Sequence, residues 1–269
     1  MVRRILLTLL FLLFVIGACF AAFQAFQIVS EYHAGEKLYD DLQQYTVIST
    51  TAPTESNPEM STENTENTAA ETRPEDAVIR DLEYPQIDFE NLLQINKDIV
   101  AWIHIDGTRI SYPVVQGTDN RHYVSTLIDG SRNDTGSIFL DFRNQRDFSN
   151  RHTIVYGHNM RNGTMFHDIC NYRTQAYYDE HPIGLIMTPE KNYYFEIVSG
   201  YVADLSDPAW QLEFVDDEDL LQWLNSTIER SPFVSQIQPQ PGDQVITLST
   251  CSYEFNNARF VLVGILKEG

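Results

Sequence analysis

The sequence has little cysteine, which limits both its covalent framework and its candidate nucleophiles. Its 269 residues include only Cys19, Cys170 and Cys251, too few for the disulfide framework of a small secreted domain. So low a content fits an exported protein as well as one from a reducing compartment. The chain also lacks an internal repeat and a glycine-rich phosphate-binding loop, which excludes the repeat architectures and the phosphate-loop nucleotide-binding folds.

Basic residues are scarce as well. The chain has 18 Lys and Arg against 38 Asp and Glu, a formal net charge of −20. No acidic residue precedes Glu31, and only Arg3 and Arg4 are basic before it, so the rest of the chain is still more acidic. A nucleic-acid partner would require a basic patch, so we expect none. The acidic surface does not disfavour a partner that carries amines, although its simplest consequence is solubility.

There is one long apolar run, from Ile5 to Val29, and it is interrupted only by Thr8, Gln24 and Gln27. A hydrocarbon core needs about 20 residues, so this run is long enough to span a membrane. Arg3 and Arg4 precede it, which places the N-terminus in the cytoplasm and the remainder outside.

Two alternatives to an uncleaved anchor exist for this run. A cleaved signal peptide would need a shorter apolar region. Ile16-Gly17-Ala18-Cys19 loosely resembles a lipoprotein cleavage box, but the chain stays apolar for ten residues beyond Cys19. We therefore expect a single-pass signal anchor over residues 1–30.

The next segment, residues 31–80, is predicted to be a largely disordered extracellular stalk. Residues 31–45 have loosely helical spacing, whereas Thr46–Asp76 is rich in Thr, Glu, Asn, Ser and Pro. Such a composition buries too little apolar surface to offset the entropy of ordering. The remaining residues, 81–269, then form one globular domain, long enough to bury a substantial core.

Within this domain, short apolar runs separated by turn residues predict strands. Before the C-terminal pair they are Ile99–Ile105, Ile110–Gln116, Ser137–Asp141, Thr153–Tyr156, Ile183–Met187 and Tyr193–Ala203. Asp106-Gly107 is a hairpin signal between the first two. Helices are predicted at Asp88–Asn96, Met165–Tyr178 and Asp216–Ile228, the last with Leu220 and Leu224 on its buried face. Many short strands with a few inserted helices indicate a mainly β fold, a closed barrel.

Three polar motifs follow predicted strands. Thr247-Leu248-Ser249-Thr250-Cys251 closes the run that begins at Gln244, Arg259 opens the run that follows, and Gly157-His158-Asn159 comes directly after Thr153–Tyr156. A cation beside a thiol stabilises the thiolate, which is the form that attacks carbonyls. Histidine moves protons near neutral pH. These are the parts of a cysteine acyl-transfer site, with Cys251 a free thiol, since pairing with Cys170 would silence it.

In this order, each at a strand end, the motifs resemble the sortase family, the membrane-anchored cysteine transpeptidases of Gram-positive bacteria. The likeness runs from about Asn96 to Lys267 and includes Trp102–Ile105, Tyr112–Gln116 and Ser137–Asn144. A long insert with its own helical pattern before the Cys251 strand is similar to class B. The resemblance implies a sortase-type barrel of about eight strands with an N-terminal helix and a helix in that insert. We expect this insert helix, Asp216–Ile228, to pack as one wall near the substrate groove.

The resemblance also implies roles for individual residues. Cys251 is the nucleophile, His158 the acid and base, and Arg259 the donor to the oxyanion. Asn120 matches a class B position that lines the peptide groove, and Ser249 and Thr250 are substrate-binding candidates with a mainly structural role. Asp141 is interpreted as a structural hydrogen-bond acceptor. No cofactor is implied, and the spacing of His152, His158 and His167 fits no zinc site.

The function implied is a membrane transpeptidase. It would cleave a C-terminal sorting signal of another exported protein through a thioester on Cys251 and pass the acyl group to an amine of peptidoglycan or of a pilin. Two other classes stay open. A papain-type secreted hydrolase requires its His after its Cys, whereas His158 precedes Cys251. A membrane-tethered binding protein that lost the chemistry would have the same composition.

Overall fold

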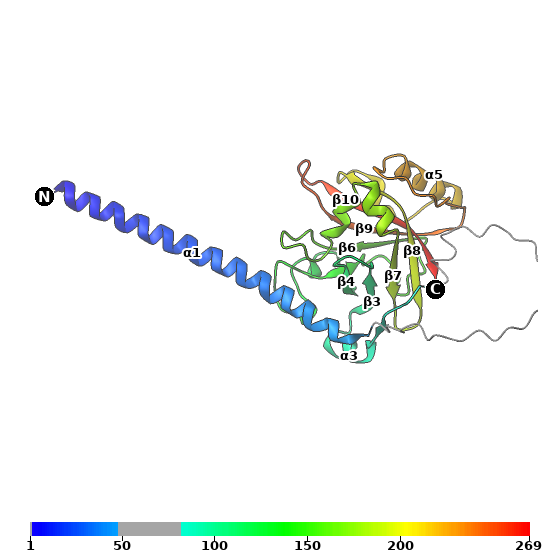
Figure 1. The fold of residues 1–269 in the computed structure, drawn as a ribbon, viewed down its shortest axis with the longest axis horizontal. Coiled ribbons are helices and arrows are strands. Elements are labelled where there is room, and N and C mark those ends of the chain that lie inside the picture. The colour runs from blue at the N-terminus through cyan, green and yellow to red at the C-terminus, as the bar shows by residue number, and fades with distance from the viewer. Residues whose placement is uncertain (1, 48–81) are drawn as a thin grey trace, which may run out of the picture.

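The computed structural model describes residues 2–47 and 82–269 (Figure 1). Its first element is one continuous helix, α1 (Val2–Leu42), which extends away from the domain. It contains a stretch long and apolar enough to cross a membrane. Residues 31–42, predicted as the start of a stalk, are therefore the last turns of this helix, while most of the stalk, residues 48–80, lies outside the described residues.

The domain is built on a closed barrel, as predicted, with strand order β10-β8-β7-β3-β4-β5-β6-β9. The strands are β3 (Ile99–His104), β4 (Ser111–Val115), β5 (Ile138–Leu140), β6 (His152–Tyr156), β7 (Ile183–Met187), β8 (Asn192–Ala203), β9 (Gln244–Cys251) and β10 (Arg259–Glu268). Neighbours are antiparallel except β4–β5 and β6–β9, which are parallel. Because β6 and β9 are parallel, both strands end at the same rim of the barrel.

The barrel core follows from the apolar runs. Trp102 and Ile103 on β3 are fully buried, and so is Ile246 on β9. The predicted hairpin is present between β3 and β4, and Gly107 in its turn has a φ of +70°, a region that favours glycine.

The helices match the predictions at two places and differ at a third. Asp88 caps α3 (Phe89–Ile95) and Asp216 caps α5 (Asp217–Ile228), each by accepting a backbone N–H. The single helix predicted over Met165–Tyr178 is wrong.

That stretch instead contains a 3-10 turn, η3 (Asp168–Asn171), and a separate short helix, α4 (Gln175–Glu180). The break has a local cause, because Thr174 is extended and its side chain caps α4 by accepting from the N–H of Tyr177. Ile169 and Tyr172 are nevertheless buried, as the pattern predicted.

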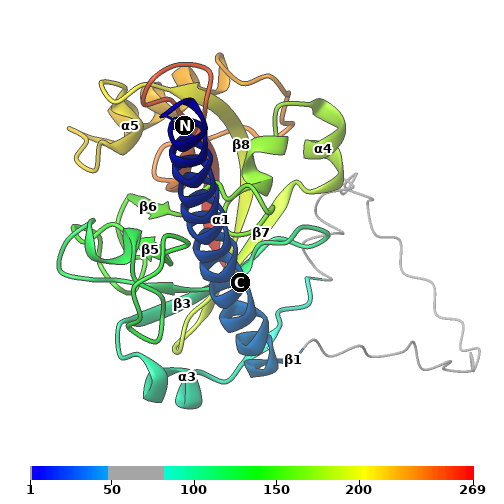
Figure 2. The same cartoon turned by 90° about the vertical axis from the view of Figure 1, so that its left-hand side faces the viewer.

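Two further strands join the N-terminal segment to the domain. After a 3-10 turn, η1 (Gln43–Tyr45), strand β1 (Thr46–Val47) pairs antiparallel with β2 (Gln86–Ile87). The end of the N-terminal segment is thus paired with the strand that precedes α3. In Figure 2, α1 lies in front of the barrel and ends beside β1.

Candidate functional site

The predicted nucleophile and the predicted cation face each other across two paired strands. Cys251 is the last residue of β9, Arg259 is the first residue of β10, and the two are direct cross-strand partners. Side chains directly opposite on antiparallel strands lie close together. The guanidinium is held by a hydrogen bond from Nη1 to the carbonyl of Ala258 at 3.0 Å. Strand pairing therefore sets the Cys251–Arg259 arrangement.

The third predicted residue, His158, reaches the same rim from the parallel neighbour. Tyr156 on β6 pairs with Ser249 on β9, and the N–H of Gly157 then donates to the Ser249 carbonyl at 3.1 Å. The hydroxyl of Thr250 donates to the Gly157 carbonyl at 2.7 Å. A Cβ on Gly157 would lie 2.3 Å from Ile138 Cδ1 and 2.7 Å from the Phe166 ring, so a larger residue there would have to displace both side chains. His158 thus leaves β6 from a rigid, crowded turn.

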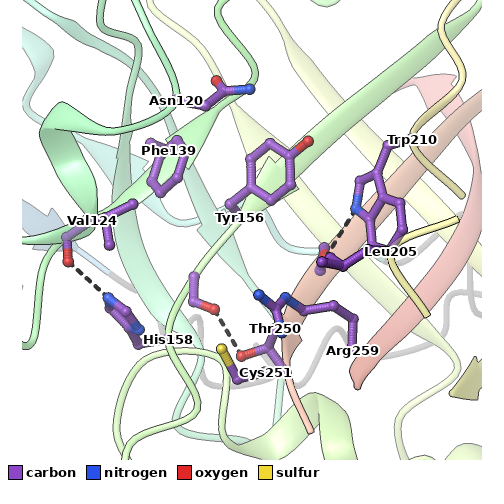
Figure 3. Close-up of a pocket in the computed structure, with 12 residues that line it drawn as sticks. Asn120, Val124, Phe139, Tyr156, His158, Leu205, Trp210, Thr250, Cys251 and Arg259 are labelled. Carbon is purple, nitrogen blue, oxygen red and sulfur yellow. Dashed lines mark hydrogen bonds between the residues drawn. The ribbon is translucent and has the colours of Figure 1, made fainter. Parts of the chain in front are cut away.

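These residues open onto one cavity of about 350 Å³. Figure 3 shows the Cys251 sulfur between the His158 ring and the Arg259 guanidinium. The lining residues are Asn120, Val124, Phe139, Tyr156, Gly157, His158, Leu205, Trp210, Ser249, Thr250, Cys251 and Arg259. All six predicted site residues are among them. The walls are mainly apolar, which suits a pocket that takes an extended peptide.

The protonation of the pair favours nucleophilic attack. The hydrogen bond with His158 lowers the pKa of Cys251 against the effect of burial, and the charge of Arg259 lowers it further. The pKa of His158 is raised, first by its hydrogen bond with Cys251 and, against burial, by the Val124 carbonyl and the nearby Asp134. Both shifts stabilise a thiolate beside an imidazolium.

The orientation of the imidazole is set by a backbone carbonyl. His158 Nε2 lies 2.7 Å from the carbonyl oxygen of Val124, at the end of the 3-10 turn η2 (His122–Val124). A carbonyl only accepts, so Nε2 carries a hydrogen and donates it. Nδ1 is then the ring nitrogen left to exchange a proton with the thiol. Figure 3 shows the Cys251 sulfur on the side of the ring away from Val124.

Asn120 lies at one end of the cavity and is held there by Asp141, which is fully buried behind it. Asn120 donates from Nδ2 to Asp141 Oδ2 at 2.9 Å and accepts the N–H of Phe142 at Oδ1. Asp141 also accepts from Tyr156 and from Arg143. Burial opposes its charge, but these bonds outweigh burial and hold the pKa of Asp141 below its ordinary value. Asp141 is thus a hydrogen-bond acceptor in a buried network, as interpreted from the sequence.

Several lining residues were missed by sequence reasoning. Trp210 and Leu205 come from the connection between β8 and α5, and Trp210 Nε1 donates to Ser249 Oγ at 3.3 Å. The helix α5 was expected to pack as one wall near the substrate groove with Leu220 and Leu224 buried; both side chains are buried, but none of the α5 residues lines the cavity. Instead Leu220 and Leu224 pack on the outer face of the barrel, in a cluster with β8 and β10. The only sequence signal for Trp210 was an isolated aromatic residue in a loop.

Other thiols and imidazoles near the site have structural partners. Burial raises the pKa of the Cys170 thiol to about 11, which leaves it protonated at neutral pH. Burial lowers the pKa of His152 to about 4, so this ring is neutral between Gln211 and Thr247. Within residues 2–47 and 82–269, no group of three or more His, Cys, Asp or Glu side chains is arranged to hold a metal ion.

A closed eight-stranded barrel with a cysteine, a histidine and an arginine at one rim defines a class, the cysteine transpeptidases of the sortase type. The sortase domain family matches residues 103–267, and the chain belongs to this family. It is similar to Sortase B of Staphylococcus aureus, with 36% identity over 183 residues that cover 67% of this chain and 75% of that protein. It is therefore a cysteine transpeptidase of class B type.

Solved structures give the same result. A complex of S. aureus sortase B with substrate aligns with a TM-score of 0.64 at 35% identity, over 67% of this chain and 84% of that one. Sortase B from Bacillus anthracis, in complex with AAEK1, aligns with a TM-score of 0.69 at 28% identity. That alignment covers 90% of this chain and 100% of the other, so the likeness extends beyond the matched domain.

Proposed function

We propose that the site cleaves the C-terminal sorting signal of other exported proteins and transfers the new acyl end to an amine. The observation that carries this is the convergence of Cys251, Arg259 and His158 on one apolar cavity. The thiolate of Cys251 attacks the carbonyl of a Thr or similar residue of the bound peptide. Arg259 donates to the oxyanion that forms, where a fixed guanidinium replaces water.

His158 supplies the protons for both halves of the reaction. In acylation its Nδ1 proton goes to the departing amine as the tetrahedral intermediate collapses, leaving the acyl group as a thioester on Cys251. In transfer the now neutral Nδ1 takes a proton from the incoming amine, which attacks the thioester and releases the thiolate. A single imidazole whose pKa lies near the working pH serves as acid first and base second.

The substrate lies along the apolar wall in this proposal. Trp210, Leu205 and Val124 contact its side chains, and Asn120 uses its second Nδ2 hydrogen toward a polar group of the signal. Ser249 and Thr250 line the floor, although the hydrogen bonds of their hydroxyls serve Trp210 and Gly157. The acceptor is an amine of peptidoglycan or of a pilin. The S. aureus sortase B complex with substrate supports the substrate-binding part of the proposal.

We further propose that α1 is a single-pass anchor in the cell membrane, with its N-terminus in the cytoplasm and the catalytic domain outside. Arg3 and Arg4 before the apolar run support this orientation. Mass spectrometry of the membrane-extracted protein tests it, and an intact N-terminal segment is expected. A lipid-modified Cys19 recovered as a new N-terminus would contradict the proposal.

Cys251→Ala tests the chemistry. We expect a folded variant that neither cleaves a sorting peptide nor forms an acyl-enzyme, since the sulfur makes the covalent bond. Peptide cleavage near the wild-type rate would refute the mechanism. Wild-type protein that binds peptide but never labels at Cys251 with a peptidyl electrophile would indicate an inactive binding protein. Cleavage without transfer to any added amine would indicate a hydrolase.

A further inference from the structure

The end of α1 beyond its apolar stretch is docked on the catalytic domain along one face. Glu31, Gly35 and Tyr39, spaced one turn apart, all contact the segment Asn133–Ser137. Asn133 Nδ2 donates to the Glu31 carbonyl at 2.8 Å, and the N–H of Asp134 donates to Glu31 Oε1 at 3.1 Å. Arg109 adds an ion pair with Glu36 at 3.1 Å.

Two residues of this face make the contact specific. Tyr39 is buried, and its hydroxyl donates to the Gly136 carbonyl at 2.7 Å and lies 3.0 Å from Ser137 Oγ. Gly35 brings the helix backbone against the loop, because a Cβ there would lie 2.7 Å from Thr135 Oγ1. A glycine inside a helix costs about 1 kcal/mol relative to alanine, so its presence at the contact fits a need for close approach.

The segment that α1 contacts lies directly behind the carbonyl that orients the proposed catalytic histidine. Gly136 packs on η2 so tightly that a Cβ on it would lie 2.6 Å from the Val124 carbonyl oxygen. The N–H of Ser137 donates to the Tyr123 carbonyl at 2.9 Å. The Val124 oxygen accepts from His158 Nε2 at 2.7 Å. A continuous set of contacts therefore joins Tyr39 to the imidazole through Gly136 and Val124.

We propose that the docked end of α1 is a positioning element for His158, with Gly35 and Tyr39 as positioning residues for the transpeptidation reaction. This rests on the role proposed above for His158. The helix holds the segment Asn133–Ser137 in place, and this segment packs against the Val124 carbonyl. That carbonyl accepts from Nε2 and so orients the His158 ring with Nδ1 toward Cys251. A misplacement of about 1 Å in such a constellation can cost about 100-fold in rate. The helix α1, whose first part is the apolar stretch, thus positions the active-site histidine with its last turns.

The chain offers a matched pair of variants. Gly35→Ala puts a methyl group into Thr135, whereas Gly17→Ala puts one on the same helix with nothing within 4 Å. Both add the same methyl group to the same helix, and only the one at position 35 meets the domain, so a difference between them reports the contact. Tyr39→Phe keeps the ring and removes only the hydroxyl that bonds to Gly136. The experiment uses the full chain in nanodiscs, with single-turnover acylation by a sorting peptide and the pH profile of Cys251 alkylation by iodoacetamide.

We expect Gly35→Ala to slow acylation by about tenfold to 100-fold, with Tyr39→Phe slower by a smaller factor and Gly17→Ala unchanged. The alkylation midpoint should move up toward the value of a free thiol, about 8.5, because His158 no longer shares its proton well. The other ionisable groups that act on this pair are Arg259, Asp134 and Cys170. In a His158→Ala background, Gly35→Ala should not move the midpoint further, since the effect acts through that ring.

The outcomes of this experiment distinguish failure of the α1 inference from failure of the proposed role of His158. If Gly35→Ala and Tyr39→Phe lower the melting temperature but leave acylation and the alkylation midpoint at wild-type values, the contact is only structural and the inference is wrong. An equal midpoint shift in the His158→Ala background would overturn it too, because the effect would bypass the imidazole. If His158→Ala itself leaves the wild-type midpoint unchanged, the proposed role of His158 fails instead. Should Gly35→Ala not fold, Tyr39→Phe alone decides.

Discussion

Replacing Arg259 by lysine separates the charge at the site from its directed hydrogen bonds. Nη1 is bound to the Ala258 carbonyl at 3.0 Å, so the remaining donors of the planar guanidinium are held toward the cavity. Lysine retains one positive charge, but its ammonium is a point charge on a flexible chain. It cannot keep the Ala258 bond and present two aligned donors to an oxyanion.

Arg259→Lys should affect the rate of acylation and the pKa of Cys251 to different extents. Loss of a directed oxyanion donor typically costs about 100-fold to 1,000-fold in turnover. The pKa of Cys251 is lowered first by His158 and only secondarily by the charge at position 259, which lysine preserves. Arg259→Lys should therefore slow acylation by about two to three orders of magnitude while the pH profile of Cys251 alkylation stays close to wild type.

Rapid-quench single-turnover acylation with a sorting peptide measures the first quantity, and iodoacetamide labelling measures the second. Arg151→Lys is a matched control, because Arg151 pairs with Asp217 on the surface and does not line the cavity. Acylation by Arg259→Lys within a few-fold of the wild-type rate would refute the oxyanion role and reduce Arg259 to a source of charge. A large upward shift of the alkylation midpoint would show that the guanidinium controls the thiolate instead.

Three further substitutions test other parts of the site and fold. His158→Ala removes the largest influence that lowers the pKa of Cys251, so the alkylation midpoint should rise toward about 8.5, and labelling should slow most at and below neutral pH, where the thiolate is lost. Leu224→Asp places an unpaired charge on the buried face of α5 and should lower the free energy of unfolding, measured by chemical denaturation, by about 3 kcal/mol. Gln222→Asp on the exposed face of the same helix should lower it little, and equal effects would show that α5 does not pack as described. Trp210→Ala should raise KM for the peptide about tenfold, ~1.4 kcal/mol, and an unchanged KM in steady-state assays would remove Trp210 from the substrate wall.

Much of the barrel and its reactive rim could be predicted from local sequence. Each strand has a short apolar run, and Cys251, His158 and Arg259 each stand where such a run begins or ends. Burial and strand termination are local properties, so they leave a pattern that can be found without knowing the fold. The caps Asp88 and Asp216 were predictable for the same reason, because a helix start depends on its own first turn.

Predictions from a local pattern failed in two ways: one predicted helix is interrupted, and one buried helix face packs in a place that the pattern does not specify. The helical spacing of Met165, Ile169 and Tyr172 correctly marked their burial, but Thr174 begins a new helix after an extended residue. The amphipathic pattern of α5 predicted a packed face and could not tell whether that face meets the cavity or the outside of the barrel. Hydrophobic periodicity states that a side chain is buried, not against what.

The contacts that hold α1 and the His158 ring join segments far apart in the chain. Tyr39 bonds to Gly136 across 97 residues of sequence, and His158 bonds to the Val124 carbonyl across 34. Neither bond has a sequence signature, because a backbone carbonyl is present at every residue and only the folded path of the chain selects the one that accepts. The positions of Cys251, His158 and Arg259 at strand ends were therefore readable in the sequence. The orientation of these side chains, the position of Trp210 in the cavity lining and the docking of α1 arise from packing between segments far apart in the chain.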